Sequence, residues 1–355
     1  MTTKYLDSKR IEGTAEDRAG YSAVSGGWKE LARTTLGSSN STIDVTGLAD
    51  KRYYMVLYNM IDDGSNSQFV TNKLGNGSFD TGSNYAERGS SNGGSEALGT
   101  NSGYWNTSGG DQVCPELTVQ YLANKSDKEK LEISHSCGAQ ADGAGTAPNR
   151  REHTGKWANT SNVIDRIRAT TAYGGRTYGT DSEMVVLGWD PDDTHTTNFW
   201  EELASVELSS ANATIDSGTI TAKKYLWFQV YCAGSTASNR CHIRMNSLST
   251  SIYSDRYSSD GGSDSTDINS GSARISNNNN TSPKFVNGFI VNNSSNEKLG
   301  IAHEVGANSA GAGSAPQRTE SVFKIATNTQ ATSLQIVNIS GNWSAGSILK
   351  VWGSN

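Results

Sequence analysis

Two stretches of the chain are closely related, and they decide the fold. The first runs from Leu117 to His135 as LTVQYLANKSDKEKLEISH and continues from Gly143 to Glu152 as GAGTAPNRRE. The second runs from Phe285 to His303 as FVNGFIVNNSSNEKLGIAH and continues from Gly311 to Glu320 as GAGSAPQRTE. At a shift of 168 residues, 16 of the 36 positions from 117 to 152 are identical. A match of this length indicates an internal duplication, so we expect two related domains.

Apolar runs between turn residues mark the other strands. The most apolar runs, 53–61 and 225–231, are continuous, which predicts central strands buried on both faces. Dense Gly, Ser, Thr and Asn separate the runs and predict about eight or nine short strands in each copy of ~165 residues. The predicted fold class is therefore all-β, with two tandem antiparallel β-sandwiches of the jelly-roll kind.

The duplication also sets the predicted domain boundaries. We place jelly-roll repeat 1 at residues 26–190, a polar linker with a proline at 191–198, and jelly-roll repeat 2 at 199–355. Residues 1–25 have mixed charge, no strand pattern and no counterpart in repeat 2. We interpret them as an N-terminal arm that docks on a neighbouring subunit or a larger assembly, with a loose terminus as the alternative.

Composition excludes several classes of function. The net charge is -6 without a basic stripe, which argues against nucleic-acid binding. No window approaches the roughly 20 apolar residues of a membrane span, so no membrane insertion is expected. The N-terminus lacks the apolar core of a signal peptide, so a protein working outside the cell would leave by another route, such as lysis.

Four cysteines lie around two predicted turns. Cys114 and Cys137 are almost equally far from the turn at 124–128, and Cys232 and Cys241 flank the turn at 234–239 in the same way. Cysteines that face each other across a hairpin can form a disulfide. The spacing therefore predicts two disulfides, with small buried thiols as the alternative.

A histidine, an arginine and a glutamate recur around each glycine loop. Such residues can form an acid–base site, or they can contact a ligand or partner. We favour a structural role, because the glycines and proline fix a turn that closes the edge of each barrel. Arg and Glu two apart on a strand also share a face and can pair. No catalytic residue is assigned. The residues of this repeated structural loop are His135, Gly143, Gly145, Pro148, Arg150, Glu152, His303, Gly311, Gly313, Pro316, Arg318 and Glu320.

A tyrosine and an arginine form a second repeated pair, Tyr85 with Arg88 and Tyr253 with Arg256. These are the candidate binding residues, because aromatic and arginine side chains stack on sugars or partner proteins. The alternative is strand pairing with a cation–π contact. Three aspartates of the linker region, at 190, 192 and 193, offer oxygen ligands for calcium but lack an EF-hand pattern. We interpret them as a solvated hinge and assign neither a metal nor a cofactor.

The leader KRIEGT at 9–14, WKELA from Trp28 and VLGWD ending at Asp190 resemble structural proteins of viruses of marine bacteria and archaea. These are jelly-roll tail-fibre, spike and capsid-associated or decoration proteins. GAGTAP at 143–148 and KWANT at 156–160 are similar as well, although repeat 2 has KIAT from Lys324. The resemblance implies a non-enzymatic virion component that is released by lysis and assembles as an oligomer.

Our leading hypothesis is a virion surface protein that is anchored by its arm and faces the host or neighbouring subunits. Its expected partners are further copies of itself, for example in a homotrimer, other virion proteins, and a host surface glycan or protein. One alternative is a double jelly-roll capsid subunit, since two barrels of about 170 residues have a suitable size. Another is an extracellular carbohydrate-binding or adhesin module. An enzyme acting on polysaccharide would need two carboxylates beside a cleft, and it is the reading we favour least.

Overall fold

The computed structural model describes residues 24–25, 27–63, 70–107, 115–171, 175–190, 193–195, 197–238 and 240–355. Every regular element in these ranges is a β-strand, so the all-β prediction is confirmed. In the part of the chain that is described, no helix is long and apolar enough to cross a membrane. The predicted N-terminal arm, apart from Val24 and Ser25, lies outside the described residues, as does Cys114.

The strands divide between the two repeats in chain order. Repeat 1 contains β2 (Lys29–Thr35), β3 (Thr42–Thr46), β4 (Tyr53–Met60), β5 (Val70–Asn76), β6 (Ser78–Phe79), β7 (Tyr85–Ser91), β8 (Ala97–Ser102), β9 (Trp105–Asn106), β10 (Glu116–Ala123), β11 (Lys130–Gly138), β12 (Asn149–Trp157), β13 (Arg166–Thr171) and β14 (Glu183–Trp189). Repeat 2 contains β16 (Glu201–Glu207), β17 (Thr214–Asp216), β18 (Tyr225–Cys232), β19 (His242–Met245), β20 (Tyr253–Ser259), β21 (Ser265–Ser270), β22 (Ala273–Arg274), β23 (Lys284–Val291), β24 (Lys298–Gly306), β25 (Gln317–Ile325), β26 (Leu334–Val337) and β27 (Ile348–Ser354). A short pair, β1 (Val24–Ser25) with β15 (Thr194–His195), joins the start of the chain to the linker.

Both repeats have the same topology. Each has a large antiparallel sheet of eight strands, in the order β2-β14-β4-β10-β11-β12-β7-β8 in repeat 1 and β16-β27-β18-β23-β24-β25-β20-β21 in repeat 2. A small sheet lies opposite, β3-β13-β5-β6 with β9 in repeat 1 and β17-β26-β19-β22 in repeat 2. The described parts of both repeats contain more strands than the eight or nine predicted, 13 in repeat 1 and 12 in repeat 2. Among the extra strands, β6, β9 and β22 have only two residues each and are too short to show an apolar run.

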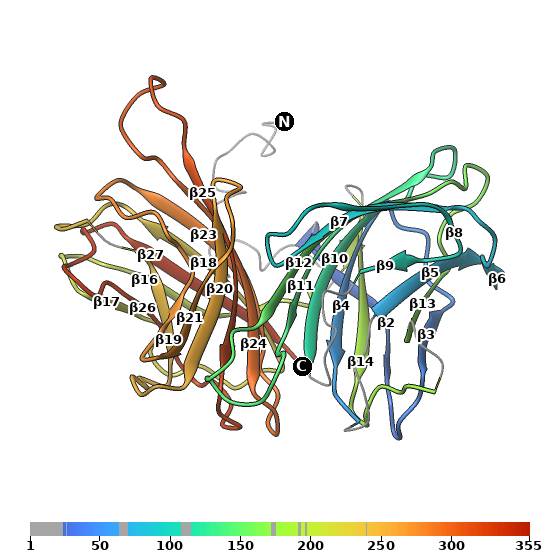
Figure 1. Ribbon diagram of the computed structural model, residues 1–355, viewed down its shortest axis with the longest axis horizontal. Helices are drawn as coiled ribbons and strands as arrows, with labels where there is room; N and C mark the ends of the chain where they lie inside the picture. Colours follow the sequence, from blue (N-terminus) through green and yellow to red (C-terminus); the bar gives the residue numbers. More distant parts are fainter. Residues whose placement is uncertain are drawn as a thin grey trace, which may run out of the picture.

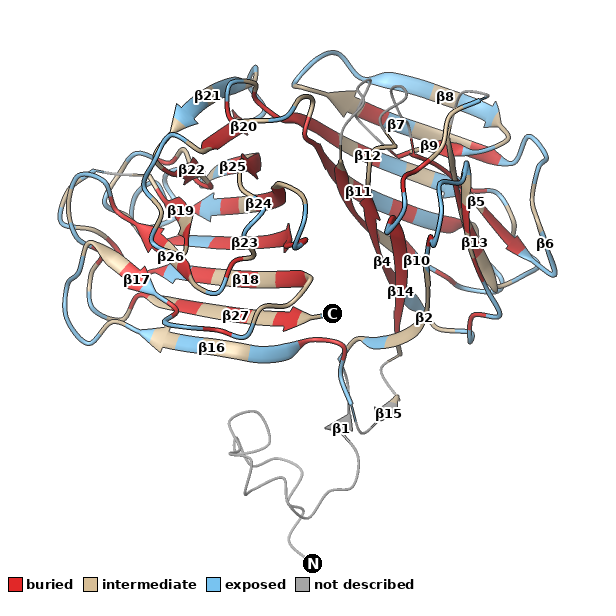
Figure 2. Ribbon diagram, turned by 90° about the horizontal axis from the view of Figure 1, so that it is seen from below, coloured by how far each residue is buried: buried red, intermediate tan, exposed pale blue. Residues whose placement is uncertain are grey.

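Three apolar clusters hold the molecule together. One lies between the two sheets of each repeat, as expected for a sandwich. The third lies between the outer faces of the two large sheets. The large sheets therefore occupy the middle of the molecule and the small sheets lie outside them (Figure 1). Figure 2 shows the same arrangement from below, coloured by burial.

The central strands differ between the repeats. In β4, every residue from Tyr54 to Met60 is buried, as predicted. In β18, burial on the outer face decreases along the strand until Tyr231, which is exposed. The prediction of burial on both faces is therefore wrong for this part of β18. The hydrophobic pattern was correct, but nothing covers the outer face there among the described residues.

The two tyrosines predicted to contact a ligand belong to the cores instead. The Tyr85 hydroxyl accepts a hydrogen bond from the Leu74 backbone N–H at 2.9 Å and donates to the Leu74 carbonyl at 3.1 Å. Tyr253 bonds Met245 and Leu248 in the same way in repeat 2. Both side chains are buried and tie the large sheet to the small-sheet side of the sandwich, so the prediction that they stack on a ligand is wrong.

We expect Tyr85→Phe to lower the free energy of unfolding by about 1–3 kcal/mol, because it leaves the buried Leu74 N–H without its partner. Urea denaturation measures this change. The control is Tyr104→Phe at an exposed site, where a change within about 0.5 kcal/mol is expected. Equal effects of the two substitutions would contradict the framework role of Tyr85.

Candidate functional site at the domain interface

The outer faces of the large sheets meet through one row of side chains from each repeat. In repeat 1, Leu117 lies between Asn59 and Cys137 on the neighbouring strands, and all three are buried. In repeat 2, the buried row is Tyr225, Val291 and Leu299. The apolar members of both rows belong to one cluster. Burial of this apolar surface is the main force that holds the repeats together.

Buried polar contacts fix the orientation of the two repeats. The Tyr225 hydroxyl donates to a carboxylate oxygen of Glu183 at 2.8 Å. Asn59 and Asn293 exchange two amide hydrogen bonds of 3.1 and 3.0 Å. Because such bonds are directional, they select one arrangement from the many that apolar packing alone would allow.

His135 and His303, which are equivalent residues of the two repeats, contact each other. Nε2 of His303 lies 3.2 Å from Nδ1 of His135, and the ring centroids are 4.2 Å apart. Burial, together with the charges of His303 and Arg150, holds the pKa of His135 well below its usual value. Burial also lowers the pKa of His303. Both rings are therefore neutral near pH 7, and a ring N–H of one donates to the other.

Arg150 is at the centre of a charge cluster that spans both repeats. Its guanidinium donates to Asp264 at 2.6 and 3.3 Å and to Glu320 at 3.3 Å, and it also pairs with Glu152 on its own strand. Its side chain and that of Asp264 are almost fully buried. Burial, and then a hydrogen bond with Glu320, raises the pKa of Glu152 to about 8. Although burial acts to raise it, the pKa of Glu320 is lowered, mainly by the Glu152 bond, so Glu152 carries the proton.

The glycine loop of repeat 1 contacts repeat 2. Lys324 donates to the carbonyls of Ala139 and Ala141, and the Gly143 N–H donates to Glu297 at 2.6 Å. Further contacts join Thr146 to Ser254, Pro148 to Arg256 and Ala144 to Asn269. The loop at 139–148 therefore joins the two domains, and the expectation that it closes the edge of its own barrel is corrected. Gly143 and Gly311 have positive φ, whereas Gly145 and Gly313 do not, so the turn requires only the first glycine of each loop.

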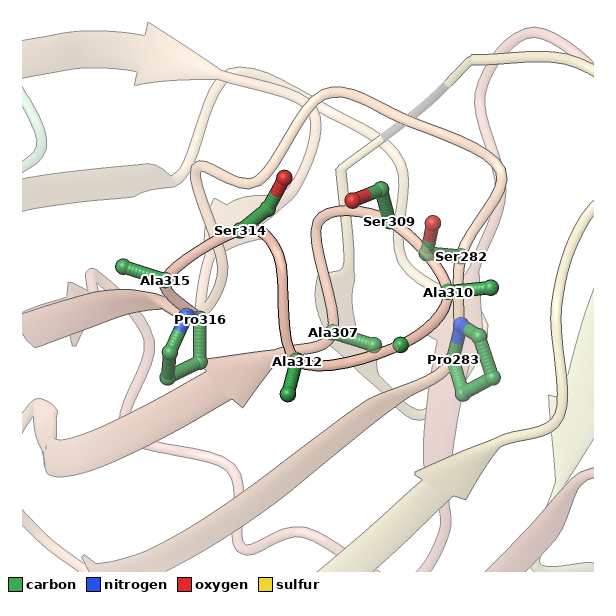
Figure 3. Close-up of a pocket in the computed structure, with 10 residues that line it drawn as sticks. Ser282, Pro283, Ala307, Ser309, Ala310, Ala312, Ser314, Ala315 and Pro316 are labelled. Carbon is green, nitrogen blue, oxygen red and sulfur yellow. The ribbon is translucent and has the colours of Figure 1, made fainter.

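The equivalent loop of repeat 2, at 307–316, is exposed along its whole length. Together with Ser282 and Pro283 it lines a shallow pocket. Figure 3 shows its small side chains spread around an open ring of backbone. The lining consists of serine, alanine, glycine and proline, so polar contacts there are left to hydroxyl and backbone groups.

The other candidate residues differ in their place. Arg88 is exposed and pairs with Glu96 away from the interface, whereas Arg256 is half-buried at the interface, where it donates to the Pro148 carbonyl. Asp190 and Asp193 both pair with Lys51, so the linker aspartates that the structure describes serve an ion pair.

Cys232 and Cys241 do not face each other across a hairpin, and the predicted Cys114–Cys137 pair involves a residue outside the described ranges. Cys232 ends β18 in the large sheet, and Cys241 precedes β19 in the small sheet, so they meet across the core with sulfurs 3.5 Å apart as thiols. A Cys232–Cys241 disulfide stays a prediction. Cys137 is a buried thiol whose sulfur lies 3.6 Å from the Phe323 carbonyl of the other repeat.

The sequence reasoning missed Asp264, Glu297 and Lys324 as interface residues. A signal was present for two of them, because Glu297 and Lys324 are identical to Glu129 and Lys156 at the shift of 168. Asp264 has no such signal, since its counterpart is Glu96. Sequence identity between the repeats does not show which of the two copies makes contacts across the domain interface.

No family model and no curated protein sequence matches the chain. Among solved structures, domains LG4-5 of the mouse laminin α1 chain align with a TM-score of 0.21 and 10% identity, over 93% of this chain and 91% of that chain. The LG1-3 region of the laminin α2 chain aligns with a TM-score of 0.23 and 8% identity, over 88% of this chain and 64% of that one. Such low scores transfer no function, and the β-sandwich assignment rests on the sheets themselves.

The neutral histidine pair should make the chain sensitive to acid. Unfolded histidine has a pKa of about 6.5, so below this pH the unfolded chain binds protons that folded His135 and His303 do not. Their stabilisation is complete above pH 6.5 and decreases as the pH falls. Relative to His135→Gln/His303→Gln, the wild-type chain should lose up to about 1.4 kcal/mol per histidine per pH unit below roughly pH 6.5. Urea denaturation at pH 7, 6 and 5 measures this difference.

His153 provides a control of opposite sign. Burial acts to lower its pKa, but hydrogen bonds with Glu132 and Glu87 raise it overall. Its stabilisation is present at low pH and is lost as the pH rises through the folded pKa, so His153→Gln should cost more at pH 5 than at pH 8. If His135→Gln/His303→Gln left the pH slope unchanged, the two histidines would not be neutral in the folded chain.

Removing one member of the buried ion pair should be costly. We expect Asp264→Ala to lower the free energy of unfolding by roughly 2–5 kcal/mol, because Arg150 then stays buried without its best partner. The matched control is Glu96→Ala at the equivalent position of repeat 1, where the exposed pair with Arg88 is worth at most about 1 kcal/mol. Similar losses from the two variants, measured in urea, would contradict the buried role of Asp264.

Proposed function

We propose that the chain is a non-enzymatic structural protein, with its two sandwiches joined into one building block of an extracellular assembly. The observation that carries this proposal is the use of the repeated histidine, arginine and glutamate. These are the residues that sequence reasoning weighed as an acid–base site, and their contacts join the repeats: His135 contacts His303, and Arg150 contacts Asp264 and Glu320.

The physical state of these groups supports a structural role. A general base must reach the proton that it removes from a substrate. Here the two histidines lie against each other in the interface, and Arg150 is almost fully buried among carboxylates. The cluster fixes two domains, as a building block requires.

We further propose that the assembly is the surface of a virus particle. This part rests on the resemblance of KRIEGT at 9–14, WKELA from Trp28 and GAGTAP at 143–148 to jelly-roll virion proteins. A tail fibre, a spike and a capsid decoration protein all agree with a two-sandwich unit anchored by an N-terminal arm. A capsid subunit is the alternative within the same setting.

Localisation tests the proposal directly. An antibody raised against the purified chain should label virus particles from the source culture in immunogold electron microscopy, and mass spectrometry of purified particles should find the chain in many copies. A glycan array with the isolated chain is the companion measurement. Label confined to uninfected cell surfaces, together with strong binding of one defined glycan, would replace the viral proposal with a cellular adhesin.

A further inference from the structure

Two contacts at the domain interface join equivalent residues of the two repeats, as contacts on a local twofold axis would. In a twofold interface, a residue close to the axis meets its own counterpart. Two such pairs occur here, since His135 contacts His303 and Glu152 is hydrogen-bonded to Glu320, each pair being related by the shift of 168. A twofold relation creates every contact twice. The contacts between the repeats described above form one half of the interface, the closed half, and the equivalent residues on the other side of the axis form its second half.

In the structure this second half, the open half, is not formed, and its large side chains are exposed. The counterparts of the buried Tyr225, Val291 and Leu299 are Tyr53, Ala123 and Leu131, which form the same kind of row in repeat 1. Leu131 is 56% exposed, against 0% for Leu299. Its neighbour on the same face, Ile133, is 54% exposed, whereas the equivalent Ile301 is 2% exposed.

Repeat 2 shows the complementary pattern. The buried row Asn59, Leu117 and Cys137 corresponds to Tyr231, Phe285 and Val305, which also lie side by side on neighbouring strands. Phe285 is 40% exposed and Val305 46%, against 1% for Leu117 and 0% for Cys137. Apart from Ala123, the side chains of the two open rows are large and mainly apolar. They are exposed at positions whose counterparts in the other repeat pack in the domain interface.

The open half also contains the counterparts of the polar residues that hold the docked loop. Lys324 and Glu297 hold the loop of repeat 1, and their counterparts Lys156 and Glu129 form an exposed ion pair of 3.0 Å on repeat 1. The loop that would dock there is 307–316, which projects away from repeat 1 above β25 (Figure 1). Its sequence GAGSAP differs from the docked GAGTAP by one hydroxyl-bearing residue.

We propose that the chain has a second closed state, in which repeat 2 rocks about the His135–His303 contact and the loop at 307–316 docks on repeat 1. In this state Lys156 donates to the carbonyls of Ala307 and Ser309, and the Gly311 N–H donates to Glu129. The exposed rows Tyr53–Ala123–Leu131 and Tyr231–Phe285–Val305 then face each other. This second closed state goes beyond the proposed function and does not depend on it.

The structure shows the closed half formed and the open half unformed. Two substitutions favour this state: Val322 packs in the closed half where the open half has Thr154, and Val291 packs where the open half has Ala123. A docked loop at 307–316 therefore belongs to the less populated state. A minor state of this kind is detected by trapping rather than by an average distance.

Disulfide trapping tests the proposal. In the closed half, Ser254 donates to the Thr146 carbonyl, and the equivalent pair in the open half is Ala86 with Ser314. Ala86→Cys/Ser314→Cys should form an intrachain disulfide under mild oxidation at least tenfold faster than Ser41→Cys/Ser314→Cys, whose first site lies between β2 and β3. Thr146→Cys/Ser254→Cys is the positive control. Peptide mapping by mass spectrometry identifies each bond.

Two substitutions connect the trapping rate to the proposed contacts. Lys156→Met should slow the Ala86–Ser314 trapping several-fold, because it removes the donor to the docked loop. Thr154→Val should speed it several-fold, because it restores the apolar residue found at the equivalent position of the closed half. Arg168→Met, at an ion pair with Asp44 in the small sheet of repeat 1, should change nothing.

Three results would overturn the proposal. The Ala86–Ser314 disulfide could form no faster than the Ser41 control, its rate could stay unchanged in Lys156→Met and Thr154→Val, or it could form only between chains. The last would assign the open half to a second copy of the chain. Non-reducing electrophoresis separates intrachain from interchain products. None of these results bears on immunogold labelling of particles, so the two proposals fail independently.

Discussion

At the centre of the domain interface, a residue of one repeat contacts its own copy in the other repeat. The duplication gives both domains the same histidine and the same glutamate, and the two copies of each residue meet in the interface. Two protonated histidines or two ionised glutamates would repel each other in a buried site. Burial, and then the charge of His303, lowers the pKa of His135, so the imidazoles stay neutral. Burial, and then the hydrogen bond with Glu320, raises the pKa of Glu152 to about 8, so one proton serves the two carboxyl groups. Arg150 supplies the positive charge that the remaining carboxylates need.

Asymmetry between the repeats follows from small differences in side chains on one face. Strand alternation places the odd-numbered residues of β11 outside the repeat 1 core and the corresponding residues of β24 outside the repeat 2 core. Along this face, burial increases from Leu131 to Cys137 in repeat 1, and it decreases from Leu299 to Val305 in repeat 2. The same strand thus has a covered and an uncovered end, and the ends are reversed between the two copies.

The sequence was sufficient for the fold but not for the interface. Apolar runs located β4, β10, β11 and β18, and the duplication predicted two sandwiches of equal topology. A period of two says which side chains share a face, but not what covers that face, so the exposure of Tyr231 and the burial of Tyr85 were both missed. The loops at 139–148 and 307–316 are identical at six of ten positions, and one is docked while the other is exposed. The loops differ in which residues surround them in the folded chain, and a sequence pattern does not contain this information.

Comparison of the repeats separates framework contacts from interface contacts. Lys130 is buried and donates to the carbonyls of Lys128 and Asn159, and Lys298 donates to Asn296 and Thr327 in the same way. A contact made in both repeats serves the sandwich itself. The glycine loop behaves differently, because its sequence is kept in both repeats while its docking contacts occur in one. A sandwich framework therefore does not account for the second loop, and a docking surface for 307–316 does.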